Sequence, residues 1–173
     1  MYKAICTFIV SMLLLGCAAQ RTVSGVQIFA YRQVMLGGPA PPVITDEKGN
    51  AKEIPMKERA EYFIYIEMPS SNIKVVDLWL RKDYYTATTE EVNTPVVRVS
   101  SVLINASPDT LVKRTSNKVL RVHPGPPGNR VTPSRSLQKK INVNELVLHY
   151  IVDGKDYYYT IPAIKNLAPV ALQ

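Results

Sequence analysis

LVLHYIVDGKDYYYTI, residues 146–161, is the stretch of sequence that decides the fold. Two runs rich in Val, Leu, Ile and Tyr flank Asp153-Gly154, and a two-residue Asp-Gly loop favours a type I′ hairpin turn. That turn sets the register, so that Val152 faces Lys155 and His149 faces Tyr158. One face of the hairpin is then almost entirely apolar and is expected to meet the core: Leu146, Leu148, Tyr150, Val152, Tyr157, Tyr159 and Ile161.

The β pattern of this hairpin extends over the rest of the chain from residue 26 onward. Short runs rich in Val, Ile and Tyr, separated by Pro, Gly and Asn, predict strands near 26–35, 60–68, 72–82, 95–105, 117–123, 145–152 and 155–161. Weaker candidates are 43–45 with 51–54, and 84–89. Thirteen prolines argue against long helices, and residues 124–135, rich in Pro and Gly, are expected to form a loop.

Two of these segments alternate in the way that antiparallel strands do. In 72–82, Val76, Leu78 and Leu80 are expected on one face, opposite Val75, Asp77, Trp79 and Arg81. In 60–68, Tyr62, Ile64, Ile66 and Met68 are expected opposite Phe63, Tyr65 and Glu67. Half-polar alternation is typical of antiparallel sheets. Seven to nine such strands predict an all-β domain, an antiparallel β-sandwich of immunoglobulin-like or transthyretin-like type.

A local resemblance bears on the choice between these sandwiches. Residues 42–51, which read PVITDEKGNA, resemble the strand-turn-strand of transthyretin-like and carboxypeptidase-regulatory-like modules. The resemblance covers ten residues and implies a sandwich of that type, without implying an activity.

The first sixteen residues have the pattern of an export signal. Lys3 supplies a positive charge, and Ile5 to Leu15 form an apolar run that is shorter than the roughly 20 residues a membrane-spanning helix needs. The following Leu14-Leu15-Gly16-Cys17 resembles the lipobox of bacterial lipoproteins. The resemblance implies that lipid is attached to the Cys17 thiol and that the chain is cut before this residue.

The domain organisation follows from this leader. Residues 1–16 are expected to be the signal peptide, 17–25 the lipidated cysteine and a short tether, and 26–173 the β-sandwich domain. Eight tether residues after Cys17 reach at most about 27 Å, at roughly 3.4 Å per residue. Cys6 leaves with the signal, so the mature chain would keep no free thiol, no disulfide and no cysteine metal site.

The charge of the chain is unevenly distributed. The formal net charge is +7, and the loss of Lys3 leaves +6. Residues 110–144 hold eight basic and no acidic residues: Lys113, Arg114, Lys118, Arg121, Arg130, Arg135, Lys139 and Lys140. The segment indicates contact with an anionic lipid, glycan or envelope protein, or else a solvated basic surface without a specific partner. Export argues against nucleic acid as the partner.

Catalytic signals are weak by comparison. No nucleophile elbow, phosphate loop or zinc-protease motif is present in the sequence. His123 and His149 lack metal-ligand spacing and are expected to be surface strand residues, so no cofactor and no metal site is expected. Trp79 is either a partly exposed aromatic that anchors an interface or stacks on a sugar, or a residue covered by a loop or a second core layer.

These observations favour a non-enzymatic binding or assembly module held at the membrane by lipid on Cys17. The alternative is a small carbohydrate-handling or hydrolytic envelope enzyme that uses Trp79 and nearby carboxylates. Ala18 follows Cys17, where the sorting rule of enterobacterial lipoproteins places Asp for inner-membrane retention. The resemblance therefore implies the outer membrane, facing the periplasm. The partner and the oligomeric state stay open.

Overall fold

The computed structural model describes residues 25–36, 43–45, 51–53, 59–69, 72–98, 108–128 and 132–171. Its main sheet has nine strands in the order β11-β10-β5-β6-β9-β4-β1-β12, with β13 also paired to β1. These strands are β1 (Gln27–Leu36), β4 (Arg59–Met68), β5 (Ile73–Leu80), β6 (Asp83–Glu91), β9 (Lys118–Pro127), β10 (Leu146–Val152), β11 (Lys155–Ile161), β12 (Lys165–Asn166) and β13 (Val170–Ala171). Among the described strands, only β12 and β13 pair in parallel, both with β1. The predicted all-β, mainly antiparallel class is confirmed.

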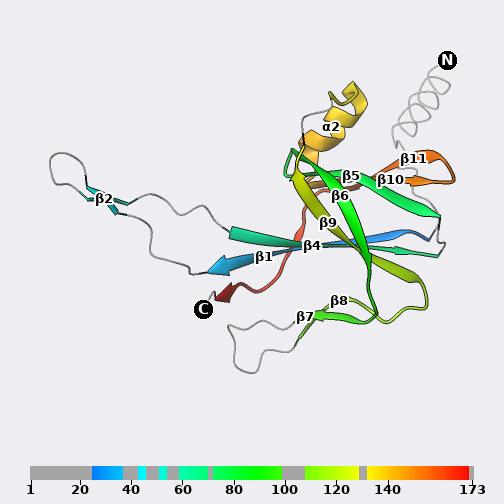
Figure 1. Ribbon diagram of the computed structural model, residues 1–173, viewed down its shortest axis with the longest axis horizontal. Helices are drawn as coiled ribbons and strands as arrows, with labels where there is room; N and C mark the ends of the chain where they lie inside the picture. The colour runs from blue at the N-terminus through cyan, green and yellow to red at the C-terminus, as the bar shows by residue number, and fades with distance from the viewer. Residues whose placement is uncertain are drawn as a thin grey trace, which may run out of the picture.

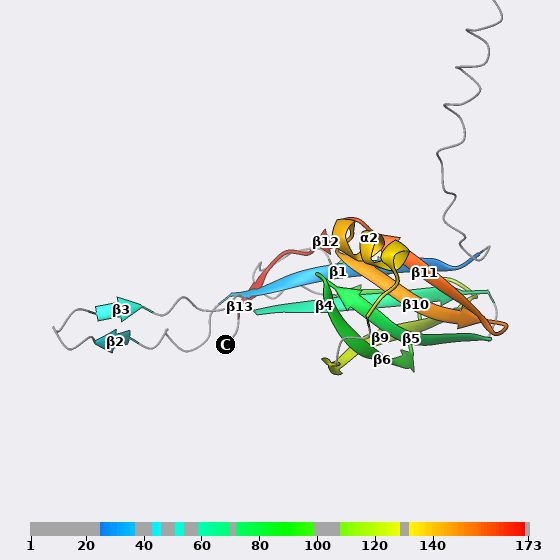
Figure 2. The same cartoon turned by 90° about the horizontal axis from the view of Figure 1, so that it is seen from above.

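Two small strand pairs and a helix complete the described elements. β2 (Val43–Thr45) pairs with β3 (Ala51–Glu53), and this pair stands apart from the main sheet (Figures 1 and 2). Both strands were predicted, whereas the turn between them lies outside the described residues and the transthyretin-like resemblance stays a prediction. β7 (Val96–Arg98) pairs with β8 (Asp109–Val112), and the helix is α2 (Arg135–Val143).

The β10–β11 hairpin has the predicted register throughout. Val152 pairs with Lys155, His149 with Tyr158 and Leu146 with Ile161. Asp153 and Gly154 have φ values of 49° and 75°, as a type I′ turn requires. The apolar face of β10 is buried as expected, because Leu146, Leu148, Tyr150 and Val152 all pack in the main hydrophobic core.

The main sheet curls (Figure 2). Its inner face, which carries Ile64, Leu78 and Leu148, packs against itself. All three side chains are fully buried, and β1, β4, β5, β9 and β10 all contribute to this core. Full burial of an aliphatic side chain contributes about 1.5–3 kcal/mol. The inner core is the largest of the three apolar clusters found among the described residues, so it dominates the hydrophobic stabilisation.

The outer face of the sheet is covered at two places. Phe63 and Tyr65 pack beneath Val112 and the rest of the β7–β8 pair. Trp79 packs beneath Ile141 of α2. Figure 1 shows α2 and the β7–β8 pair on opposite sides of the curled sheet.

The predicted alternation is correct in β4 and wrong in part of β5. Val75 shares the inner core with Leu78, although strict alternation would put these two residues on opposite faces. The register with β10 shifts between His149 and Tyr150, so that Val76 is an extra residue in β5. A bulge of this kind adds one residue to one strand and reverses the alternation beyond it.

Helix α2 was not predicted, and its first residue, Arg135, is the last residue of the expected loop 124–135. Ser134 caps the helix, because its hydroxyl accepts a hydrogen bond from the backbone N–H of Leu137 at 3.3 Å. Leu137 and Ile141 lie one turn apart and both face the sheet. Three apolar residues in nine, of which Val143 is exposed, gave too weak a periodicity for the helix to be predicted.

Strand β9 corrects the start of the same expected loop, because it continues to Pro127. Residues 118–122 pair with β4, whereas residues 123–127 pair with β6 alone. Proline has no N–H to donate but is tolerated where one side of a strand has no neighbour. The three prolines of β9 all fall in this one-sided part.

Candidate binding surface

The lipobox residues and Cys17 lie outside the described residues, so lipidation stays a prediction. The first described residue is Gly25. A Cβ atom at Gly25 would lie 3.0 Å from Cγ of Pro69. The start of the domain is therefore packed against the end of β4. Among the described residues, no helix is long and apolar enough to cross a membrane.

Two of the eight predicted basic residues are taken up by ion pairs on the sheet. Lys118 Nζ lies 2.8 Å from a carboxylate oxygen of Glu91. Arg121 Nη2 lies 3.6 Å from Oε1 of Glu61. Arg130 lies outside the described residues. These pairs leave five described basic residues as candidates for contact with an anionic partner.

The five remaining basic residues are exposed and form two separate groups. Lys113 and Arg114 lie between β8 and β9, and Arg135, Lys139 and Lys140 lie on α2. None of the five has an ion-pair partner within the described part of the chain. Because α2 and β8 lie on opposite sides of the sheet, the two groups lie on opposite sides as well (Figure 1). The described part of the basic segment is thus not one continuous patch.

Helix α2 and the β10–β11 hairpin share a cavity that adds a further cation. The cavity has a volume of about 420 Å³, and its lining includes Lys140, Lys155, Asp156 and Tyr158. Lys155 follows the hairpin turn and lies outside the predicted basic segment. Sequence reasoning missed it because only the packing of α2 on the sheet brings Lys140 and Lys155 to the same hollow.

Trp79 is a covered residue and not an exposed interface aromatic. Its exposed fraction is 6%, and its ring lies 5.4 Å from that of Tyr84 and 6.4 Å from that of Tyr158. The covering element is α2, which contributes Ile141. Of the two readings of Trp79 left open by the sequence, the covered one is therefore correct.

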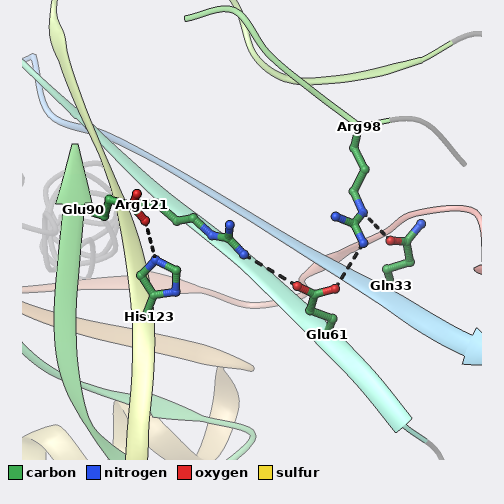
Figure 3. Close-up of polar contacts among 6 residues, drawn as sticks. All are labelled: Gln33, Glu61, Glu90, Arg98, Arg121 and His123. Atoms are coloured by element: carbon green, nitrogen blue, oxygen red, sulfur yellow. Dashed lines mark hydrogen bonds and ion pairs between the residues drawn. The ribbon is translucent and has the colours of Figure 1, made fainter. Parts of the chain in front are cut away.

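A polar cluster, here called the Glu61 cluster, joins four elements on the outer face (Figure 3). Its members are Gln33 of β1, Glu61 of β4, Arg98 of β7 and Arg121 of β9. Glu61 accepts from Arg98 Nη2 at 3.1 Å and lies beside Arg121. Arg98 also donates through Nε to the Gln33 side chain.

The Glu61 cluster is held in place by contacts with neighbouring side chains and backbone. The Arg98 guanidinium lies 4.0 Å from the centre of the Phe63 ring, which favours a cation. Gln33, only 1% exposed, donates through Nε2 to the carbonyl of Ala168 at 2.8 Å. Because each charge has a partner, the cluster fastens β7 to the sheet and offers no unpaired group for chemistry.

A second polar cluster centres on His149. Its Nδ1 lies 3.2 Å from Asp77 Oδ1 and its Nε2 lies 2.8 Å from Asp156 Oδ1. The ring stacks on Tyr158 at 4.6 Å, and Asp77 also accepts from the Tyr84 hydroxyl. The hydrogen bond with Asp77 raises the pKa of His149, partly opposed by burial. The predicted pairing opposite Tyr158 is confirmed, but the His149 side chain is only 12% exposed.

His123 lies within β9 and not at a strand end, because the strand continues past Pro124. Its Nε2 lies 3.3 Å from a carboxylate oxygen of Glu90 on β6 (Figure 3). Within the described ranges, no group of three or more His, Cys, Asp or Glu residues is arranged to hold a metal ion.

The class that the fold and these clusters define is an all-β domain with a partly covered outer face and two exposed groups of cations. Comparisons with protein-family models, with curated proteins and with solved structures found no match for this chain.

Proposed function

We propose that this chain is a lipid-anchored lipoprotein of the bacterial cell envelope and that its β domain is a non-enzymatic binding module for an anionic partner. The observation that carries the anchor is Leu14-Leu15-Gly16-Cys17 directly after a short apolar run with Lys3 before it. Two or three acyl chains on Cys17 would hold the domain stably, whereas one chain binds only reversibly.

The exposed cations of α2 support the binding role. Arg135 and Lys139 are exposed, and no carboxylate pairs with them among the described residues. Lys140 and Lys155 line one cavity. Each basic residue close to a charged membrane contributes about 1 kcal/mol of attraction, and the attraction decays over about 8 Å at physiological salt.

The envelope location follows from the same leader. Ala18 stands after Cys17, where Asp would indicate retention at the inner membrane in the enterobacterial sorting rule. We therefore place the anchor in the outer membrane, with the domain facing the periplasm. A carbohydrate-handling role through Trp79 is not proposed, because Trp79 lies beneath α2.

Vesicle sedimentation tests the binding role. The domain without residues 1–17 should bind vesicles of anionic lipid weakly, and neutral vesicles hardly at all. Replacing Arg135 and Lys139 by Gln should weaken anionic binding severalfold at low salt, with a smaller effect at high salt. The matched control replaces Arg59 of β4 and Lys74 of β5, both exposed, by Gln. Equal binding by the wild type and both variants would contradict a role for α2.

A further inference from the structure

We infer that a cavity between β1, the end of β4 and the β8–β9 connection binds a zwitterionic ammonium–phosphate headgroup, as carried by ethanolamine phospholipids. This Glu67 cavity has a volume of about 370 Å³, and its lining includes Gln27, Phe29, Tyr31, Glu67, Lys113 and Arg114. Small-ligand cavities in proteins typically measure about 300–1,000 Å³. The inference rests on the proposed lipid anchor, which fixes where the cavity lies.

Glu67 supplies the negative part of the site. The residue is 8% exposed, and its Oε1 accepts hydrogen bonds from Thr115 Oγ1 and Asn117 Nδ2, both at 2.7 Å. No cation pairs with Glu67 within the described part of the chain. Buried carboxylates are normally paired with a positive group, so a ligand ammonium would complete this site.

The β8–β9 connection is held rigidly around Glu67. The Thr94 hydroxyl donates a hydrogen bond to the carbonyl of Thr115 at 3.2 Å. The backbone N–H of Thr115 in turn donates to Thr94 Oγ1, also at 3.2 Å. The Asn117 N–H donates to Thr115 Oγ1 at 3.1 Å. The donors to Glu67 are therefore preorganised, which reduces the entropy lost when a ligand binds.

Lys113 and Arg114 supply the positive part. Both are exposed, both line the cavity that Glu67 lines, and neither forms an ion pair with Glu67. Charges of opposite sign thus share one cavity without neutralising each other. A ligand carrying both charges, held a few atoms apart, satisfies both groups at once, whereas a simple anion or a simple cation satisfies only one.

The cavity lies at the tethered end of the domain. Gln27 pairs with Glu67 across β1 and β4, and Met68 pairs with Lys118 at the start of β9. The start of β1, two residues after Gly25, is therefore beside the cavity. Since residues 18–25 reach at most about 27 Å, lipid on Cys17 would keep the cavity close to the headgroups of its own membrane.

Ethanolamine fits the negative part better than choline does. A primary ammonium has three N–H donors for a carboxylate, whereas a quaternary ammonium has none and is bound chiefly by aromatic faces. The Tyr31 ring already has the Lys165 ammonium 5.8 Å from its centre. The acceptor oxygens of Glu67 are thus the main recognition element for the ligand cation.

Calorimetry on the full-length lipidated protein in uncharged detergent tests the ligand. Glycerophosphoethanolamine should bind at least tenfold more tightly than ethanolamine, glycerol 3-phosphate or glycerophosphocholine. Glu67→Gln, which keeps an acceptor for Thr115, should weaken binding at least tenfold, as should the pair Lys113→Gln and Arg114→Gln. The matched control, Arg59→Gln with Lys74→Gln, at exposed residues of β4 and β5 that do not line the cavity, should bind within twofold of the wild type.

Several results would overturn the inference. Wild-type affinity in Glu67→Gln would remove the carboxylate from the site, and equal affinity for glycerol 3-phosphate would remove the need for an ammonium. Tighter binding of diglycine would assign the cavity to peptide ends instead. If Glu67→Gln fails to fold, the exposed pair Lys113 and Arg114 decides the question.

A second measurement separates a membrane headgroup from a free ligand. In vesicles containing ethanolamine phospholipid, the backbone amides of residues 113–117 should exchange hydrogen at least threefold more slowly than in vesicles of choline phospholipid alone. Equal exchange, despite binding of the soluble compound, would contradict a membrane source. The mass of the Cys17 peptide from the same preparation shows separately whether the lipid anchor is present.

Discussion

At the scale of single residues, the outer face of the sheet shows how charge is accommodated next to a core. Glu61 is shared by Arg98 and Arg121, and both guanidiniums lie over the Phe63 ring, at 4.0 and 5.5 Å from its centre. Two cations on one carboxylate would leave an excess of positive charge, which the electron-rich ring face offsets. Burial raises the pKa of the neighbouring Tyr65, so its hydroxyl stays protonated.

His149 makes the stability of the domain depend on pH. Its folded-state pKa is raised above the ordinary histidine value of 6.5, mainly by the hydrogen bond with Asp77. The charged contacts therefore contribute fully below about pH 6.5 and are lost as the pH rises through the folded-state pKa. We expect His149→Gln to lower the free energy of unfolding by about 1–2 kcal/mol at pH 5, and by less at pH 9.

Urea denaturation of wild type and variant from pH 5 to 9 measures this difference. Asp77→Asn serves as the control, because it removes the largest cause of the raised pKa and should flatten the same pH dependence. A His149→Gln effect that is constant across the range would show that the contacts are not linked to protonation.

At the scale of elements, the β10–β11 hairpin depends on the backbone of its turn. Gly154 has φ of 75°, and nothing lies within 4 Å of a Cβ added there, so substitutions are strained by conformation and not by crowding. Gly154→Val should lower the free energy of unfolding by about 1–2 kcal/mol, because β-branched residues resist positive φ. Gly154→Asn, which tolerates positive φ, should cost much less. Melting of both variants within a degree of wild type would argue against the turn.

The elements that could be predicted from sequence are those with strong local signals. The hairpin register followed from Asp153-Gly154, and β4 followed from strict alternation. The Val76 bulge has no local signal, since it depends on how β5 pairs with β10. The prolines in β9 argued for a loop. The one-sided pairing that tolerates them is a property of the sheet and not of the segment, so the segment alone could not reveal it.

Helix α2 is held to the sheet by few side chains, and Ile141 is the most buried of them at 2% exposed. Ile141→Ala should lower the free energy of unfolding by about 2–4 kcal/mol. It should also shift Trp79 fluorescence to longer wavelength, because Trp79 lies beneath this residue and is the single tryptophan of the chain. Val143→Ala, at a position 73% exposed in the same helix, should change stability by less than about 0.5 kcal/mol. Unchanged fluorescence in Ile141→Ala would contradict the packing.

At the scale of the whole molecule, the candidate sites combine residues that are far apart in the sequence. The basic segment was visible as composition, but its division between α2 and the β8–β9 connection depends on the fold. Glu67 was predicted only as the outward residue of a strand, and its place beside Lys113 required the pairing of β4 with β9. Composition identified the charges, whereas strand order determines which of them meet.

The proposed lipid anchor and the β domain together would form a tethered binding module. The Glu67 cavity and the first described residues share one end of the sheet. Lipid on Cys17 would therefore present that end to the membrane and leave the opposite end, with the β2–β3 pair, directed away from it (Figures 1 and 2). This orientation requires lipid on this one cysteine.

Incorporation of radiolabelled palmitate in cells tests that claim most directly. Wild type and Cys6→Ser should both be labelled, because Cys6 lies inside the leader and away from the junction. Cys17→Ser should be unlabelled, because a serine hydroxyl does not replace the thiol in thioether formation. Equal labelling of Cys17→Ser and wild type would contradict the lipid anchor.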